Sequence, residues 1–185
     1  MSKILSIDEY KKRIKRVVIT EEQIKNAIQK VGKQISDSYD GRPILLVSIL
    51  NGAFVFMSDL AKAITVPCEI AFMRTQSYFS GTSSTGKVNI LMDVEQDLSK
   101  YHVIIVEDII DTGRTLKVVC DILKQRNPLS LRVVTLLDKK ERRVVDFNAD
   151  IVLFEIPDFF VIGYGLDCDE YFRNLPYIAE YNQEI

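Results

Sequence analysis

Carboxylates, hydroxyls and a glycine gather directly behind an apolar run in residues 103–115, which read VIIVEDIIDTGRT. Residues 103–106 are apolar without interruption and rich in β-branched side chains, which is typical of a central parallel strand covered on both faces. We expect this strand to end at Val106, so that Glu107 and Asp108 follow it. A helix is predicted next, because its apolar residues share one face: Leu116, Val119, Cys120 and Leu123.

The polar loop between strand and helix is placed where a ligand is expected, since ligands of open α/β sheets bind beyond the carboxyl ends of the strands. Thr112, Gly113 and Thr115 offer backbone N–H groups, hydroxyls and close backbone approach at a helix start, which suits a phosphate. The three carboxylates of the segment would repel that phosphate. They should therefore face hydroxyls, a magnesium ion or a proton to be removed, and the segment predicts a ligand with both a phosphate and a polyol.

This 13-residue segment resembles the signature of the type I phosphoribosyltransferases, which bind 5-phosphoribosyl-1-pyrophosphate. The resemblance implies that Glu107 and Asp108 bind the ribose, and that Asp111 lies beside N7 of a purine as the candidate general base. It implies a 5-phosphate site made of Asp111, Thr112, Gly113, Arg114 and Thr115. The alternative interpretation is a strand end and helix start that carry solvated acids.

Composition limits the class of protein. A chain of 185 residues is expected to form one domain, here residues 1–185. The net charge of −2 argues against a sequence-independent nucleic-acid partner. Three scattered cysteines and one histidine offer no zinc-ligand spacing and favour a reduced, cytoplasmic location. With no secretory signal and no apolar run near 18 residues, we expect a soluble protein without a membrane partner.

Alternating strands and helices should position the polar loop. A capping box of Thr20 and Gln23 opens a helix whose apolar residues share one face, and 44–50 reads as a buried strand. Further strands are predicted at 68–77, 87–92, 131–137 and 151–156. The fold class is therefore α/β, a mainly parallel twisted sheet flanked by helices, with a small hood subdomain. We expect the core at about 20–155 and the hood at about 1–19 and 156–185.

Asn51 and Gly52 follow the strand at 44–50 and precede another apolar helix, so they form a second strand-to-helix loop. Taken alone, this loop is either an ordinary tight turn or a binding loop. From here on the chain resembles the hypoxanthine-guanine phosphoribosyltransferases, whose matching loop binds pyrophosphate through backbone N–H groups and can contain a cis peptide bond. Many members carry lysine or arginine where Asn51 stands, so this chain has one cation fewer there.

The tract at 78–86 is rich in glycine and small hydroxyl residues. Its glycines fit P-loop spacing up to Lys87, but Val88 replaces the Ser or Thr that binds magnesium, and a strand is predicted next instead of a helix. A hairpin tip or an active-site lid fits better. The resemblance implies a lid in which Ser77 and Tyr78 close over the reacting centre.

Three residues are candidates for binding a purine. Lys139 at a strand end is either solvated or, as the resemblance implies, a hydrogen-bond donor to the exocyclic oxygen of the base. Phe160 either belongs to the hydrophobic core or, as the resemblance implies, is the aromatic residue whose ring stacks on the base. Val161 would then contact the base through its backbone groups.

The resemblance also implies a metal site and a pyrophosphate site. Asp167 matches a ligand of Mg²⁺, with Glu107 and Asp108 as further metal-site candidates, and Arg173 matches a residue that contacts pyrophosphate together with Asn51 and Gly52. Cys168 stands where a tyrosine is often found.

The implied reaction is transfer of a phosphoribosyl group from phosphoribosyl pyrophosphate to N9 of a 6-oxopurine, in a homodimer or homotetramer. A non-enzymatic regulator on the same fold would lack the catalytic acid and the stacking aromatic, whereas Asp111 and Phe160 are both present. A phosphoribosyltransferase for a pyrimidine or adenine is a second alternative. Lys139 as a donor favours a 6-oxo over a 6-amino group. The preference among hypoxanthine, guanine and xanthine stays open.

Overall fold

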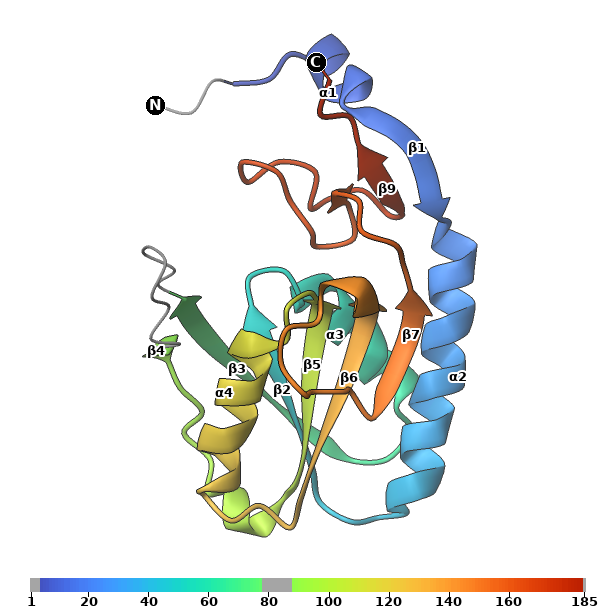
Figure 1. The fold of residues 1–185 in the computed structure, drawn as a ribbon. Coiled ribbons are helices and arrows are strands. Elements are labelled where there is room, and N and C mark those ends of the chain that lie inside the picture. The colour runs from blue at the N-terminus through green and yellow to red at the C-terminus, as the bar shows by residue number, and fades with distance from the viewer. Residues whose placement is uncertain (1–3, 78–87, 185) are drawn as a thin grey trace.

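The computed structural model describes residues 4–77 and 88–184 of the chain (Figure 1). Its main body is a six-stranded sheet in the order β4-β3-β2-β5-β6-β7, in which β3 and β4 are antiparallel and the other neighbours are parallel. This confirms the predicted fold class. The strands are β2 (Ile44–Leu50), β3 (Cys68–Ser77), β4 (Val88–Met92), β5 (His102–Ile110), β6 (Ser130–Asp138) and β7 (Ile151–Glu155).

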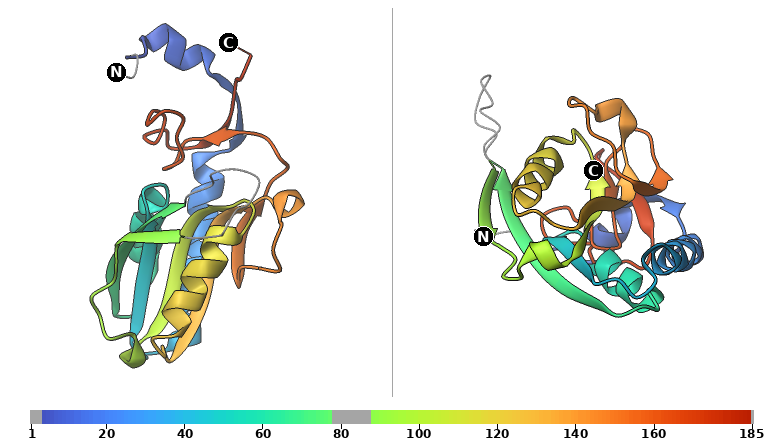
Figure 2. Two further views of the ribbon diagram at one scale, coloured as in Figure 1. Left: turned by 60° about the vertical axis from the view of Figure 1, so that its left-hand side comes forward. Right: turned by 90° about the horizontal axis from the view of Figure 1, so that it is seen from below.

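Helices cover both faces of this sheet (Figures 1 and 2). The helices α2 (Glu21–Tyr39) and α3 (Phe54–Ala63) pack on one face, and α4 (Arg114–Lys124) packs on the other. Ile104 of β5 belongs to the first of these two hydrophobic clusters and Ile105 to the second. Because β5 is buried between two layers, its residues 103–106 are apolar without the alternation of a half-exposed strand.

The helix start predicted from the capping box is confirmed. The Gln23 backbone N–H donates to Thr20 Oγ1 at 3.2 Å, and the Thr20 N–H donates to Gln23 Oε1 at 2.8 Å. The apolar faces of α2 and α4 are buried as their spacing predicts. None of the helices in residues 4–77 and 88–184 combines the length and the apolar character that crossing a membrane requires.

A second sheet lies above the carboxyl ends of the main strands (Figure 1). It is antiparallel, in the order β1-β9-β8, with β1 (Ile14–Ile19), β8 (Val161–Ile162) and β9 (Ile178–Tyr181). We call this sheet and residues 156–177 the hood. Its small core contains Ile162, Phe172, Leu175 and Ala179. The sequence pattern indicated neither the short helix α1 (Ile7–Lys12) before β1 nor β9.

One predicted boundary is wrong, because β5 does not end at Val106. It continues to Ile110, since β6 runs beside it as far as the pair Ile110↔Asp138, whereas β2 separates from it after Val106. The alternation of its side chains is nevertheless interrupted: Val106 and Ile109 are three residues apart, yet both pack in the cluster under α2 and α3. The irregularity falls on the two acids between them.

The predicted loop at 78–86 lies outside the described residues, and so does Tyr78 of the implied lid pair. Ser77 is the last residue of β3. The chain resumes in β4 and not in a helix, which agrees with the rejection of a P-loop.

Candidate active site

A cavity of about 240 Å³ opens at the carboxyl ends of β2 and β5, beside the start of α4. The structure thus brings together the predicted phosphate loop, the acidic pair and part of the predicted pyrophosphate loop. A larger hollow of about 740 Å³ lies between α2, α3 and the hood, and among the predicted site residues that the structure describes, only Arg173 lines it. We therefore place the site at the smaller cavity. The predicted site residues that line the smaller cavity are Gly52, Glu107, Asp108, Asp111, Thr112, Gly113 and Thr115.

The loop from β5 to α4 presents the start of the helix to this cavity. Gly113 is the residue before the helix and has a φ of 79°, a left-handed conformation that glycine adopts without strain. A Cβ at Gly113 would lie only 3.0 Å from Arg143 Cδ. The Arg114 backbone N–H donates to Thr112 Oγ1 at 3.4 Å. A helix N-terminus with its positive dipole end at a cavity is suited to bind an anion.

The acidic pair is buried enough to change its ionisation. Burial, and then the charge of Asp108, raises the pKa of Glu107 well above its usual value. Burial raises the pKa of Asp108 to about 6, although a hydrogen bond from the Ile109 N–H at 2.8 Å acts in the opposite direction. Within the described residues, Glu107 Oε2 is buried without a hydrogen-bond partner. Buried carboxylates that lack partners cost stability, so the pair is suited to meet hydroxyls or a cation.

The loop between β2 and α3 is held tightly between the acids and the hood. The Leu50–Asn51 peptide bond is cis. A Cβ on Gly52 would lie 1.6 Å from Asp108 Oδ2, and a Cβ on Gly165 of the hood would lie 2.1 Å from the Gly52 carbonyl oxygen. Only glycines allow this approach of three segments, so the two positions fix the hood close to the cavity.

Asp167 and Arg173 lie on the hood side of the same region. Asp167 Oδ1 is 3.0 Å from Arg173 Nη2, and Arg173 Nη1 donates to the Gly165 carbonyl oxygen at 2.8 Å. Both charges act on the pKa of Asp108, which Arg173 lowers and Asp167 raises. The predicted metal ligand and the predicted pyrophosphate contact are therefore close enough to the acidic pair to interact with it electrostatically.

The three predicted purine contacts lie at the junction of β6 and the hood. Lys139 follows β6 and is buried, with Nζ 3.5 Å from Asp158 Oδ1. Phe160 is 41% exposed, and its ring meets the Tyr181 ring edge to face at 5.5 Å. Val161 is buried in β8. An aromatic ring this exposed is not core, so the core interpretation of Phe160 is wrong.

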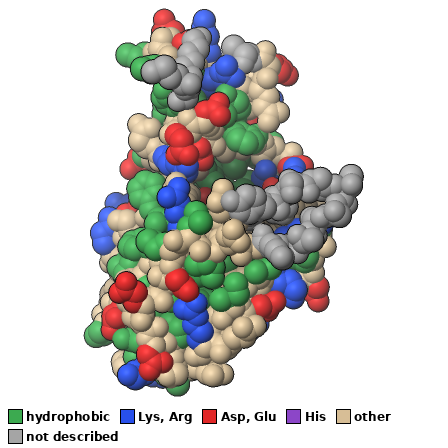
Figure 3. All heavy atoms as spheres, turned by 90° about the vertical axis from the view of Figure 1, so that its left-hand side faces the viewer, with side chains coloured by type: hydrophobic (Ala, Val, Ile, Leu, Met, Phe, Trp, Pro, Cys, Tyr) green, Lys and Arg blue, Asp and Glu red, His purple; other side chains and the backbone are tan. Residues whose placement is uncertain are grey.

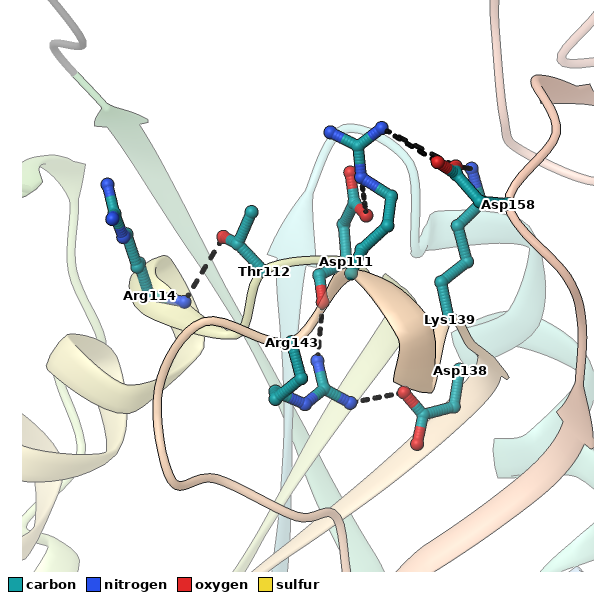
Figure 4. A network of polar contacts seen from close by, with 8 residues as sticks. Asp111, Thr112, Arg114, Asp138, Lys139, Arg143 and Asp158 are labelled. Atoms are coloured by element: carbon teal, nitrogen blue, oxygen red, sulfur yellow. Dashed lines mark hydrogen bonds and ion pairs between the residues drawn. The ribbon is translucent and has the colours of Figure 1, made fainter.

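Asp111 is held by two successive arginines, a contact that the sequence pattern did not indicate. Arg142 Nε lies 2.7 Å from Asp111 Oδ1, and Arg143 Nη1 donates to the Asp111 carbonyl oxygen at 2.6 Å. Arg143 also forms an ion pair with Asp138. Figure 4 shows Asp111 on the loop before α4, with Arg143 below it and Lys139 reaching toward Asp158.

These arginines belong to the run 138–143, reading DKKERR, which looks like a solvated turn. The run contains the single turn η2 (Lys140–Arg142), whose first residue, Lys140, pairs with Glu155 on the surface. Acidic and basic residues mixed in one short run next to a strand end are the signal that could have indicated a bridging role. The direction in which the arginine side chains point depends on how the turn folds back over the loop before α4.

Comparisons with known proteins show the family of the chain. A family model described as a phosphoribosyl transferase domain matches residues 19–169. Over 172 residues, the chain is 47% identical to a hypoxanthine-guanine phosphoribosyltransferase of Streptococcus pneumoniae and 46% identical to one of Staphylococcus aureus, covering 93% of this chain and 96% of each relative.

Solved structures show the same similarity over nearly the whole length. A crystal structure of a hypoxanthine phosphoribosyltransferase from Staphylococcus aureus has a TM-score of 0.91 at 44% identity and covers 97% of both chains. A hypoxanthine phosphoribosyl transferase structure from Trypanosoma cruzi has a TM-score of 0.87 at 41% identity, covering 91% of this chain and 92% of that one. With this identity and coverage, and with the predicted phosphate loop and the acidic pair at one cavity, the chain belongs to the phosphoribosyltransferase family, among the hypoxanthine-guanine phosphoribosyltransferases.

Proposed function

We propose that the chain transfers the 5-phosphoribosyl group of phosphoribosyl pyrophosphate to N9 of hypoxanthine or guanine and releases pyrophosphate. The products are the nucleoside monophosphates IMP and GMP. One observation carries the proposal: a helix start suited to phosphate and two buried acids suited to hydroxyls line the same cavity. A phosphate alone would be repelled by the acids, and a sugar alone would not use the helix N-terminus.

The phosphoribosyl group would lie along the loop from β5 to α4. Residues 111–115 would bind its 5-phosphate through backbone N–H groups and hydroxyls at the start of α4. Glu107 and Asp108 would accept hydrogen bonds from the ribose hydroxyls. The interrupted alternation of β5 supports this role, because it lets two adjacent residues line one cavity. Burial then keeps the reacting carbon away from bulk water.

The purine would bind between β6 and the hood. Lys139 would donate to the 6-oxo group, Phe160 would stack on the ring, and Val161 would contact the base through its backbone. Asp111 would accept the proton from N7 as general base, a role that contributes roughly 10²- to 10⁴-fold to the rate. Leaving-group departure before bond formation gives an oxocarbenium-like C1, which the neighbouring carboxylates stabilise electrostatically.

The residues beside the acidic pair fit a magnesium ion that is shared with the substrate. Within residues 4–77 and 88–184, no three His, Cys, Asp or Glu side chains are grouped to hold a metal ion by themselves. Magnesium commonly uses one or two carboxylates plus substrate phosphates and keeps several waters. Asp167, with Glu107 and Asp108 as further candidates, offers such carboxylates, and Glu107 has a buried oxygen to satisfy. When bound, the ion neutralises charge on the departing pyrophosphate.

The pyrophosphate itself would lie between the β2–α3 loop and the hood. Asn51 and Gly52 would bind it through their backbone, since the Asn51 side chain carries no charge. Arg173 would bind it through its guanidinium group, which now pairs with Asp167 at 3.0 Å and with Glu170 at 3.0 Å. Exchange of these carboxylates for phosphate oxygens would keep the arginine paired.

We further propose that the chain works as a homodimer or homotetramer in the cytoplasm. The face that carries β3 and β4 supports the assembly, because apolar side chains gather there (Figure 3). Their exposed fractions are 45% for Ile70, 40% for Phe72, 55% for Leu91 and 41% for Met92. Unpaired cysteines support the reducing location. Light scattering on the protein as it elutes from a size-exclusion column measures its mass and so tests the assembly. A monomeric mass at micromolar concentration would contradict it.

A steady-state assay with a panel of nucleobases tests the reaction. The protein, phosphoribosyl pyrophosphate and Mg²⁺ are mixed with hypoxanthine, guanine, xanthine, adenine or uracil, and nucleotide formation is followed. We expect turnover with hypoxanthine or guanine and a kcat/KM for adenine at least about 10³-fold lower. Binding of phosphoribosyl pyrophosphate without any turnover would favour a regulator on the same fold. Preference for adenine or uracil would favour another phosphoribosyltransferase.

A further inference from the structure

We propose that Arg142 is a positioning residue for the reaction, which holds the Asp111 carboxylate in the orientation needed to accept a proton from the purine. This inference rests on the proposed function. It concerns a residue outside the motif at 103–115 that carries the family resemblance. Arg142 belongs to the η2 turn after β6, and its side chain pairs with Asp111 and Asp158, which lie outside that turn.

Four side chains of alternating charge form a bridge across the purine side of the site. Lys139 Nζ lies 3.5 Å from Asp158 Oδ1, Asp158 Oδ2 lies 3.3 Å from Arg142 Nη1, and Arg142 Nε lies 2.7 Å from Asp111 Oδ1. The two ends of the bridge are the two polar side chains proposed to contact the purine. Arg142 and Asp158 therefore connect the group that recognises the base to the group that accepts its proton.

The backbone of Asp111 is fixed independently of its side chain. Arg143 donates to the Asp111 carbonyl oxygen at 2.6 Å, and the Val144 N–H donates to the Thr112 carbonyl oxygen at 3.2 Å. The Asp111 side chain, however, is 44% exposed and has two rotatable bonds. Without Arg142, it could turn toward solvent while the loop stayed in place.

The geometry of the contact leaves half of the carboxylate available. Arg142 approaches Oδ1 through Nε, so Oδ2 of Asp111 can face the purine. Asp158 holds the other end of the guanidinium through Nη1, which restricts rotation of the arginine. Because misplacement of a catalytic group by about 1 Å can cost up to roughly 10²-fold in rate, a residue that only orients Asp111 should affect kcat.

The test compares Arg142→Ala with a matched control on the same turn. Lys140→Ala removes a neighbouring cation that pairs with Glu155 and has no contact with Asp111. We expect Arg142→Ala to lower kcat for hypoxanthine about tenfold, a partial loss of positioning, while the KM for phosphoribosyl pyrophosphate changes less than about twofold. Lys140→Ala should keep both values. Arg142→Gln, which retains most of the side-chain length, should reproduce the loss of kcat if the alanine variant folds poorly.

A double-mutant cycle shows whether Arg142 acts through Asp111. In the Asp111→Ala background, where no carboxylate remains to be oriented, Arg142→Ala should change kcat by less than about twofold. An undiminished tenfold effect in that background would overturn the proposal, and so would a wild-type kcat in both Arg142 variants. Failure of the proposed function looks different, because the wild-type protein itself would then convert no 6-oxopurine.

Discussion

The replacement Asp108→Asn should stabilise the free protein, and by an amount that depends on pH. The carboxyl group has a pKa of about 6 in the folded protein against an ordinary value of 3.8, mainly because it is buried. The folded state therefore binds the proton more tightly than the unfolded state. The stabilisation that the folded protein gains from this tighter proton binding is fully present below pH 3.8 and is lost as the pH rises through 6. Asparagine has the same shape, does not titrate and can still accept the Ile109 N–H.

The size of the effect follows from the difference between the pKa of about 6 in the folded protein and the ordinary value of 3.8. At 1.36 kcal/mol per unit, the charged carboxylate destabilises the folded protein by about 3 kcal/mol at pH 8. About half of this cost is present at pH 5, where the unfolded group is ionised and the folded group is mostly protonated. The values are upper bounds, because Asp108 lines a cavity that is partly open to water. Loss of the Asp108 charge also relieves Glu107, which acts in the same direction.

Urea denaturation at pH 5, 6, 7 and 8 measures this prediction through the midpoint and slope of each transition. The variant should be more stable than the wild type by a margin that grows from pH 5 to pH 8. Asp146→Asn, on the exposed loop after η2, gives the background effect of removing a surface carboxylate. A margin that stays constant with pH, or a variant less stable than wild type at pH 8, would refute the reasoning.

Three further variants test individual contacts. Lys139→Met should lower the ratio of kcat/KM for hypoxanthine to that for adenine at least about tenfold, because the donor to the 6-oxo group is lost; an unchanged ratio would leave Lys139 a structural lysine. Arg143→Met should cost about 3 kcal/mol in urea denaturation, since it leaves Asp138, whose side chain is 2% exposed, without its cation; no change in midpoint would contradict this. Gly52→Ala places a Cβ 1.6 Å from Asp108 Oδ2 and should weaken phosphoribosyl pyrophosphate binding at least about tenfold in calorimetry, whereas wild-type affinity would show that the loop can move.

Much of the main sheet follows from local patterns in the sequence. The predicted ranges of β2 and β3 match the structure, because β2 is an apolar run that only the buried Ser48 interrupts and turn residues lie on both sides of it. The start of α2 follows from its capping box. The site could be placed at the strand ends because parallel sheets bind ligands there.

The features that were missed depend on partners distant in sequence. The strand β5 continues beyond Glu107 and Asp108 because β6 runs beside it. The polarity of the sequence at Glu107 cannot reveal a neighbouring strand. The strand β9 forms because β1, from the other end of the chain, lies beside it. Arg142 and Asp158 meet although they are 16 positions apart in the sequence and β7 lies between them, and each alone resembles a solvated surface charge.

The proposed site binds the ribose of phosphoribosyl pyrophosphate and the purine base through different residues. The double variant Glu107→Gln with Asp108→Asn tests this division most directly. Both side chains keep their shape and lose their charge, so the cavity should persist. If these acids bind the ribose while Lys139 and Phe160 bind the base, the KM for phosphoribosyl pyrophosphate should rise at least about tenfold and the KM for hypoxanthine less than about twofold. Equal increases in the two KM values would contradict the account.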